Sequence, residues 1–509
     1  MADTSENNKR IAKNTIMLYF RMMLMMLVAL YTSRVVLSTL GVEDYGIYNV
    51  VGGFVTLFSF LNGAMSGGTL RFLTFSLGKG DKDELNKTFS TCFLTHASIA
   101  ALILILAESI GLWFVLTKLT IPEGRMAAAM WVYQCSIIAS IIIVTTLPYS
   151  TVIIAHEKMS AFAYLSILEA FLKLGIVYLL LLGDVDRLIF YSILHLVVGV
   201  LMRAINVIYC YIKFPETHYI GIWDKALFKK IMSFSGWNLW GNISVVLMTQ
   251  GVNVVLNIFF GPTVNAARAL AVQVQGAVQQ FSQNFQTALN PQITKLYAAN
   301  NLSQMHMLVL RSAKFTFLLL LCLSLPILFE TPLLLSLWLD ETPDYTVVFV
   351  RLMICITIID SVANSLVTAA NATGNIKKYQ MVVGGILLLI VPVSYVALKI
   401  SANPVLVYVV HICIAICAFA ARLYLVRPMI SMPTSKYVKN VFVPILTVGA
   451  CSLICTLGIS SLLPDTTIGS IVNIAQSVII SLIISFSLGL TSNEKAFVLS
   501  KLKVLKGKS

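Results

Sequence analysis

Long apolar runs dominate this chain and leave few architectures open to it. Runs of about 20 residues, the length that a helix needs to cross a bilayer, recur from one end of the sequence to the other. Of the 509 residues, 58% are hydrophobic and only 11% are charged, against about 25% charged residues in soluble domains. Because lipid offers no partner for free backbone groups, such runs must be helices. The composition excludes an ordinary soluble enzyme and a long disordered protein.

We predict an all-α polytopic membrane protein with fourteen transmembrane spans. Spans longer than about 25 residues are expected to tilt or to project beyond the lipid. The predicted spans are 15–38, 45–76, 88–116, 126–154, 159–182, 187–213, 231–259, 264–296, 305–338, 345–372, 377–399, 403–427, 437–463 and 468–490. These spans leave no room for a folded domain outside the membrane, so function must lie within the membrane or at its two faces.

The distribution of basic residues predicts the orientation of the chain. With a cytoplasmic N-terminus, the predicted inner segments hold 26 Lys and Arg residues and the outer segments and ends hold 7. Basic residues are retained on the cytoplasmic side of membrane proteins. We therefore expect both termini in the cytoplasm, and the net charge of +14 needs no nucleic-acid partner. The polar segment 1–14 lacks a cleavage site, so the first span is expected to act as the insertion signal.

The sequence also repeats itself at a fixed offset. Gly41 begins GVEDYGIYNVVGG at the entry to the second span, and Gly261 begins GPTVNAARALAVQ at the entry to the eighth. The same offset of 220 pairs Ile11 with Ile231. A parallel repeat of six spans is indicated, with its halves related by an axis along the membrane normal. The predicted parts are an N-terminal six-helix bundle at 1–213, a cytoplasmic linker at 214–230, a C-terminal six-helix bundle at 231–427, and two extra helices with a basic tail at 428–509.

Three segments carry a family resemblance. KRIAKNTIMLYF, LSTLGVEDYGIYNVVGGFVTLFSFLNGAMSGGTLRF and GLTSNEKAFVLSKLK resemble the polysaccharide-transport branch of the multidrug/oligosaccharidyl-lipid/polysaccharide exporter superfamily, and more narrowly bacterial O-antigen and capsule-repeat flippases. The sharpest motif is Leu-Gly-x-x-x-Tyr-Gly after the first span, and the resemblance covers the whole chain.

The resemblance implies a fold, a cargo and a location. The fold would be MATE-like, with two six-helix bundles facing each other across a central cavity and working by alternating access. The cargo would be a polyprenyl-pyrophosphate-linked oligosaccharide in the bacterial cytoplasmic (inner) membrane, and polysaccharide-assembly proteins would be partners.

Carboxamide side chains gather in the seventh and eighth spans. Fifteen Asn and Gln residues lie between Asn238 and Gln292, and several recur at helical spacing on one face. Carboxamides can hydrogen-bond sugar hydroxyls in a water-filled cavity without a fixed charge. Hydrogen bonding between helices is the structural alternative. The residues expected to line the cavity and contact sugar are Asn238, Asn242, Asn253, Gln275, Gln279, Gln283, Gln286 and Asn290.

Three arginines in or near the spans are candidates for the pyrophosphate. Charged residues within a membrane are expensive and tend to be kept for function, and a guanidinium binds phosphate through two parallel hydrogen bonds. Arg34 and Arg268 lie near the predicted outer ends of the repeat-related first and eighth spans, and Arg21 lies deeper in the first. For Arg34 and Arg268 the alternative is snorkelling to the lipid headgroups.

Three further charged residues are candidates for ion coupling or gating. Glu169 and Lys173 stand four apart in one span, which suits either a neutralising pair or a proton-linked gate. Asp360 stands alone among apolar residues in the tenth span, as a carrier of H⁺ or Na⁺ would. No metal site or other cofactor is predicted, because the six histidines and nine cysteines have no metal-ligand spacing.

Two alternatives remain beside the flippase. A proton- or sodium-coupled multidrug exporter of the same superfamily would favour an acidic cavity lined by aromatic residues. A membrane glycosyltransferase or polymerase would need a sizeable outer loop, and the predicted outer loops have about ten residues or fewer. We therefore expect a transporter and not an enzyme.

Overall fold

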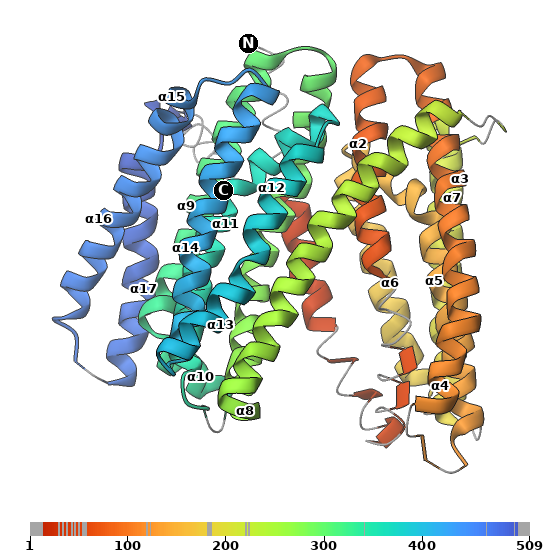
Figure 1. The fold of residues 1–509 in the computed structure, drawn as a ribbon, viewed down its shortest axis with the longest axis horizontal. Coiled ribbons are helices and arrows are strands. Elements are labelled where there is room, and N and C mark those ends of the chain that lie inside the picture. Colours follow the sequence, from red (N-terminus) through yellow and green to blue (C-terminus); the bar gives the residue numbers. More distant parts are fainter. Residues whose placement is uncertain are drawn as a thin grey trace, which may run out of the picture. The chain divides into compact units, whose positions relative to one another are not determined.

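In the structure, a computed structural model, all the regular secondary structure of the described residues is helical (Figure 1). These are residues 14–28, 31–32, 35–36, 39–41, 44, 47–48, 51–52, 59–118, 121–122, 124–180, 186–218, 221, 224–339, 342–464, 466–492 and 494–496. Within them there is no β-strand. The predicted all-α membrane fold is confirmed at this level.

By contacts the chain forms two units. Unit 1 comprises Met1–Asn242 with Thr287–Ala299, and unit 2 comprises Ile243–Gln286 with Asn300–Ser509. The helices of unit 1 are an apolar helix at Asn14–Val28, α2 (Ser59–Lys79), α3 (Lys82–Leu106), the π-helix η1 (Ala107–Gly111), α4 (Leu112–Lys118), α5 (Met126–Ala155), α6 (Met159–Leu179), α7 (Arg187–Lys213) and the 3₁₀ turn η2 (Pro215–Thr217). α8 (Lys225–Ala298) contributes to both units.

Unit 2 contains the remaining helices. They are α9 (Leu302–Phe329), α10 (Thr331–Trp338), α11 (Thr346–Thr373), α12 (Lys377–Leu388), α13 (Ile390–Ile400), α14 (Val405–Met429), α15 (Thr434–Tyr437), the π-helix η3 (Val438–Phe442), α16 (Val443–Ser460), α17 (Thr467–Ile484) and the π-helix η4 (Ser485–Gly489). α9 and α11 are the most buried of the long apolar helices, and α17 and α16 pack on α9.

Eleven helices in the described part of the chain are long and apolar enough to cross a membrane. Each corresponds to one of the fourteen predicted spans. The other three predictions are 15–38, where an apolar helix is described over Asn14–Val28, 45–76, which lies partly outside the described residues, and 264–296. The segment 264–296 is helical, but its many amides make it too polar to count as a span on composition. The chain is thus a multi-pass membrane protein.

One predicted single span is broken in the structure, and another is disturbed at one residue without being broken. The span predicted at 305–338 divides at Glu330, where α9 ends and α10 begins with Pro332 in its first turn. The span predicted at 377–399 is present as one membrane-spanning helix, Lys377–Ile400, in which Leu389 separates α12 from α13 while keeping helical backbone angles (φ −64°, ψ −17°). Pro392 lies four residues after Leu388, and a proline ring clashes with the carbonyl group four residues before it. Apolar runs alone do not reveal the break at Glu330, so the prediction of one continuous span over 305–338 was wrong, whereas the span predicted at 377–399 is confirmed.

The break within α8 lies at the residue that the sequence repeat marks. Gly261 has φ 73° and ψ −168°, so two helical arms meet there. Gly41, its partner at the offset of 220, also has a positive φ of 80°. Only glycine reaches such backbone angles without steric strain. α8 begins at Lys225, inside the segment predicted as a linker.

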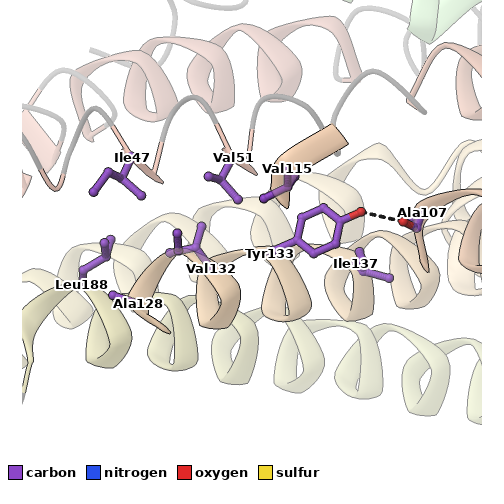
Figure 2. Close-up of a cluster of buried hydrophobic side chains, with 10 residues drawn as sticks. Ile47, Val51, Ala107, Val115, Ala128, Val132, Tyr133, Ile137 and Leu188 are labelled. Carbon is purple, nitrogen blue, oxygen red and sulfur yellow. Dashed lines mark hydrogen bonds between the residues drawn. The ribbon is translucent and has the colours of Figure 1, made fainter. Parts of the chain in front are cut away.

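A cluster of buried apolar side chains connects several helices of unit 1 (Figure 2). Val132, Tyr133 and Ile137 of α5 pack there against Val115 of α4 and Leu188 of α7. The Tyr133 hydroxyl donates a hydrogen bond of 2.7 Å to the carbonyl oxygen of Ala107, at the start of η1. The single polar group on this aromatic ring is therefore satisfied inside the apolar cluster.

An ion-pair network fixes the helix starts beside this cluster. Arg125, the N-cap residue of α5, binds both Asp44 and Asp186, and Asp186 caps α7 by accepting from the amides of Leu188 and Ile189. Although burial raises the pKa of Asp186, its hydrogen bonds with Arg125 and with these amides lower the pKa below its usual value overall. A lowered pKa means that the charged form stabilises the fold, and this stability is lost as the pH falls through the folded-state pKa.

We predict that replacing Arg125 by Gln lowers the thermal stability at neutral pH. The two carboxylates would lose a shared partner that is about a quarter exposed, so we expect a loss on the order of 1–2 kcal/mol. Thermal unfolding of the detergent-solubilised protein measures it. The difference from wild type should shrink as the pH is lowered below about 4, where aspartates become protonated. A difference that is independent of pH would contradict the role of Asp186.

Gly78 of α2 allows a close approach of the last turn of α8 within unit 1. A β-carbon at residue 78 would lie 2.8 Å from both the Cβ atom of Ala298 and the carbonyl oxygen of Lys295. These are backbone and short side-chain atoms, which cannot move aside cheaply. The lack of a side chain at residue 78 is therefore required by the packing.

Replacing Gly78 by Ala should destabilise unit 1 by about 1–3 kcal/mol. Gly199 in α7 provides the control, because a β-carbon there meets no atom within 4 Å. We expect Gly199→Ala to be neutral or slightly stabilising, since alanine favours helix. Equal melting temperatures for the two variants would show that the approach of α8 to Gly78 is not close.

Candidate substrate-binding site

The residues predicted to contact sugar are divided between the two units. Asn238, Asn242 and Asn290 belong to unit 1, while Asn253, Gln275, Gln279, Gln283 and Gln286 belong to unit 2. In the described structure Asn242, Gln279 and Gln283 are exposed, Gln286 is buried, and the others are half-buried. Helical spacing placed the amides of each span on one face, but their burial is not uniform along either face.

Two of these amides are used within unit 2 as contacts between helical segments. The Gln286 side chain donates to the Thr316 hydroxyl of α9 at 3.3 Å. Asn253 donates to the side chain of Gln250 at 3.1 Å and also accepts from Arg268. For Gln286 and Asn253 these contacts agree with the alternative to sugar binding, which is hydrogen bonding between helical segments. Gln275 and Gln279 have no hydrogen-bond partner within the described part of the chain, so their amides are available to a ligand.

Arg268 is a buried cation held by neutral groups. Its side chain lies in the second arm of α8, with 4% of the residue exposed. Nε donates to the Asn253 Oδ1 atom at 2.5 Å, and Nη2 donates to the carbonyl oxygen of Thr249 at 3.2 Å. Both acceptors lie in the first arm of α8, so the break at Gly261 brings them to Arg268. The guanidinium is thus fixed in position by its own helix.

Among the described residues, no acid matches the charge of Arg268. Tyr408 and His411 of α14 interact electrostatically with it, and no carboxylate of the described residues forms an ion pair with it. Buried charges in proteins are normally paired. An arginine has five N–H donors, and the contacts with Asn253 and Thr249 use two of them. The arrangement leaves both charge and donors for an anionic ligand.

Of the other two arginines predicted to bind pyrophosphate, the structure describes Arg21 but not Arg34. Arg34 lies outside the described residues. Arg21 stacks on the Phe162 ring of α6, with its guanidinium carbon 4.6 Å from the ring centre. Its Nε is buried and has no hydrogen-bond partner among the described residues. Arg21 belongs to unit 1 and Arg268 to unit 2.

Glu169 and Lys173 form the ion pair that their spacing predicted. The Lys173 Nζ atom lies 2.8 Å from the Glu169 Oε1 atom. The structure adds a second base, since the Arg203 Nη2 atom of α7 lies 3.9 Å from the other carboxylate oxygen. Arg21 and His195 also interact electrostatically with Glu169. The sequence reasoning identified the pair but missed the contribution of α7.

The prediction that Asp360 stands alone was wrong. The Arg422 Nη1 atom of α14 lies 3.4 Å from its carboxylate, and Tyr379 of α12 interacts with both. Arg422 is separated from Asp360 by 62 residues, so spacing along the chain could not reveal the pair. In the count of basic residues, Arg422 falls among those of the inner segments. Whether Asp360 takes part in ion coupling remains a prediction.

Glu157 is a buried acid that sequence reasoning did not select. It follows α5 with a φ of 59°, and its side chain is fully buried. Its carboxylate accepts from Lys295 at 2.8 Å and from Gln292 at 2.9 Å, while its carbonyl oxygen accepts from Asn14. Glu157 therefore joins the first helix, the α5–α6 turn and the last turns of α8. A lone acid between two apolar spans was the signal available in the sequence.

We predict that Glu157→Gln destabilises unit 1 by about 1–3 kcal/mol, because Lys295 would lose its buried counter-charge. The matched control is Glu84→Gln, which removes an ion pair with Lys79 whose side chains are 39% and 41% exposed. The control should change stability by less than about 1 kcal/mol. Thermal unfolding of both variants measures the difference. Similar losses in the two would show that burial of Glu157 has no energetic consequence.

Comparisons with known proteins support a transporter fold. No protein-family model and no curated protein matches the sequence. Among solved structures, the chain is similar to a point mutant of a MATE transporter, with TM-score 0.71 at 14% identity over 83% of this chain and 97% of that one. It is also similar to a multidrug resistance MATE family transporter of the MOP superfamily in an outward-facing conformation, with TM-score 0.70 at 14% identity, covering 84% and 96%.

A third solved structure is a MOP superfamily transporter from Pyrococcus furiosus, described as having a binding pocket of reversed polarity that suggests a different function. It matches with TM-score 0.70 at 14% identity over 84% of this chain and 96% of that one. At such low identity the likeness shows the fold alone. The chain therefore has the fold of MATE/MOP membrane transporters, and its fold neighbours are transporters and not enzymes.

Proposed function

We propose that this protein is a flippase that moves polyprenyl-pyrophosphate-linked oligosaccharide repeat units across the bacterial cytoplasmic membrane, for assembly of a surface polysaccharide such as O-antigen or capsule. The observation that carries the proposal is Arg268, a buried and rigidly held guanidinium without a carboxylate partner among the described residues. A pyrophosphate supplies the missing negative charge, and arginine suits its geometry.

The amides of α8 support the sugar part of this proposal. Gln275 and Gln279 follow Arg268 along the same arm and have no hydrogen-bond partner in the described residues. A carboxamide offers both donors and acceptors to sugar hydroxyls. Because a carboxamide carries no charge, it can bind a neutral glycan without selecting one particular sugar. The resemblance of three segments of the sequence to O-antigen and capsule flippases agrees with this division of roles.

A proton- or sodium-coupled multidrug exporter is the second candidate, because two of the similar structures are MATE transporters, one of them described as a multidrug resistance transporter. An exporter of cations needs an acid that a drug can pair with. Two acids near the middle of described helices, Glu169 and Asp360, are each paired with a base, whereas Glu108 of η1 has a hydrogen bond from Gln134. This charge pattern favours an anionic substrate. A membrane glycosyltransferase or polymerase ranks third.

A flipping assay tests the proposed function. The purified protein is placed in liposomes with a fluorescent polyprenyl-pyrophosphate sugar in both leaflets, and a membrane-impermeant quencher is added outside. We expect wild-type protein to raise the quenched fraction above that of empty liposomes. Arg268→Gln should slow this rise about tenfold or more, since a charge-assisted phosphate contact is lost. Arg268→Lys should retain part of the activity because it keeps the charge.

The control is Lys399→Gln, at the exposed end of α13, where Lys399 lies over the ring of Tyr395. This variant should flip the lipid at the wild-type rate. A quenched fraction equal to that of empty liposomes, together with efflux of cationic dyes driven by a proton or sodium gradient, would replace the flippase by the exporter. It would then make Asp360 the residue to test.

A further inference from the structure

Unit 1 contains a cluster of charges from three helices that the contacts at Arg268 do not involve. Glu169 and Lys173 belong to α6, Arg203 and His195 to α7, and Arg21 to the first helix. Glu169 and Arg203 each lie about ten residues from an end of their helix, which is about 15 Å along the axis. The cluster is therefore near mid-depth in two apolar helices, where a charge is most costly.

The cluster carries more positive than negative charge. Three bases, Arg21, Lys173 and Arg203, interact with the single carboxylate of Glu169. No other carboxylate of the described residues forms an ion pair with them. Side chains such as these pair with one another or face the protein interior or a water-filled space. Pairing alone leaves two positive charges without a partner.

The donors of these bases are only partly used. The 3.9 Å between Arg203 and Glu169 is too long for a hydrogen bond, so the close contact of the carboxylate is the one with Lys173. The Nε atoms of Arg21 and Arg203 are buried and have no hydrogen-bond partner among the described residues. A buried donor left unpaired costs about 1–3 kcal/mol. An anionic ligand would supply both the acceptors and the negative charge that these two arginines lack among the described residues.

The side chains of the cluster are only partly covered by the protein. The side chains of Glu169, Lys173 and Arg203 are 22%, 35% and 24% exposed. Because Glu169 contacts Lys173 closely, it takes the place that a ligand's anion would occupy on that base. A phosphate or pyrophosphate with more negative charge and more acceptor oxygens than one carboxylate would suit Lys173 and Arg203 together, and Arg21 would add positive charge nearby.

We propose that Lys173 and Arg203, with the positive charge of Arg21 nearby, form a second anion-binding site, in unit 1, for a phosphate or pyrophosphate group, and that Glu169 competes with the ligand for it. The assignment of that group to the carrier lipid rests on the proposed function. When no ligand is bound, the Glu169 carboxylate neutralises part of the positive charge of the site. The Glu169–Lys173 ion pair therefore forms in the empty site and breaks when a ligand binds.

Binding of pyrophosphate by the intact purified protein tests the site. The measurement is titration calorimetry in a maltoside detergent, because this detergent contains no phosphate group. The probes are inorganic pyrophosphate and a short-chain polyprenyl pyrophosphate. Lys173→Gln and Arg203→Gln should each weaken binding about tenfold, and Glu169→Gln should strengthen it about tenfold by removing the competitor. Arg203→Lys, which keeps the charge, should bind better than Arg203→Gln and shows that the site still folds.

Lys213→Gln is the control, because Lys213 is an exposed base at the far end of the same helix as Arg203. It should bind as wild type does. Equal binding of the two probes would identify the free anion as sufficient for the site, and binding of the polyprenyl form alone would identify a lipid-linked group. Both support the site.

Two results would overturn the proposal. One is unchanged or weaker binding in Glu169→Gln. The other is binding that is lost in Arg268→Gln but intact in Lys173→Gln and Arg203→Gln, which would leave the proposed function standing without this site. If the wild-type protein flips no lipid but Arg203→Gln still loses pyrophosphate binding, the anion-binding site stands and the proposed flippase function falls.

Discussion

The cost of placing charge inside apolar helices governs this structure. A charged side chain at the centre of a membrane helix costs about 2.5–3.5 kcal/mol on insertion scales, so each one must find compensation within the protein or from a ligand. Glu169 and Asp360 find it in bases of neighbouring helices. Arg268 finds amide and carbonyl oxygens but no acid among the described residues. The balance that is left inside the helices is positive, and it favours a substrate with negative charge.

The fold was largely predictable because its cause is local. Apolar length identifies a spanning helix, and eleven described helices coincide with predicted spans. The break at Glu330 was missed since the apolar pattern continues across it. The internal repeat drew attention to Gly261 of α8, and the positive φ of this residue shows that the helix is interrupted there. The chemistry of single residues, more than hydropathy, therefore decides where a helix ends.

The site was less predictable because its partners come from distant parts of the chain. Spacing found Glu169 with Lys173, which share a helix, but could not find Arg203 or Arg422, which lie on other helices. It also could not separate amides that serve structure, such as Gln286, from amides that have no hydrogen-bond partner among the described residues, such as Gln279. Both kinds have the same residue type and the same helical spacing. Only the packing of neighbouring helices distinguishes them.

The central claim is that these buried cations select the charge of the substrate. The most direct test compares two fluorescent lipids in liposomes containing the wild-type protein: one joins an oligosaccharide to a polyprenol through pyrophosphate, and the other joins the same oligosaccharide through an uncharged linkage. We predict that the pyrophosphate lipid becomes accessible to an external quencher and that the uncharged lipid does not. Equal translocation of both lipids would contradict the account, because the cations would then have no part in recognition.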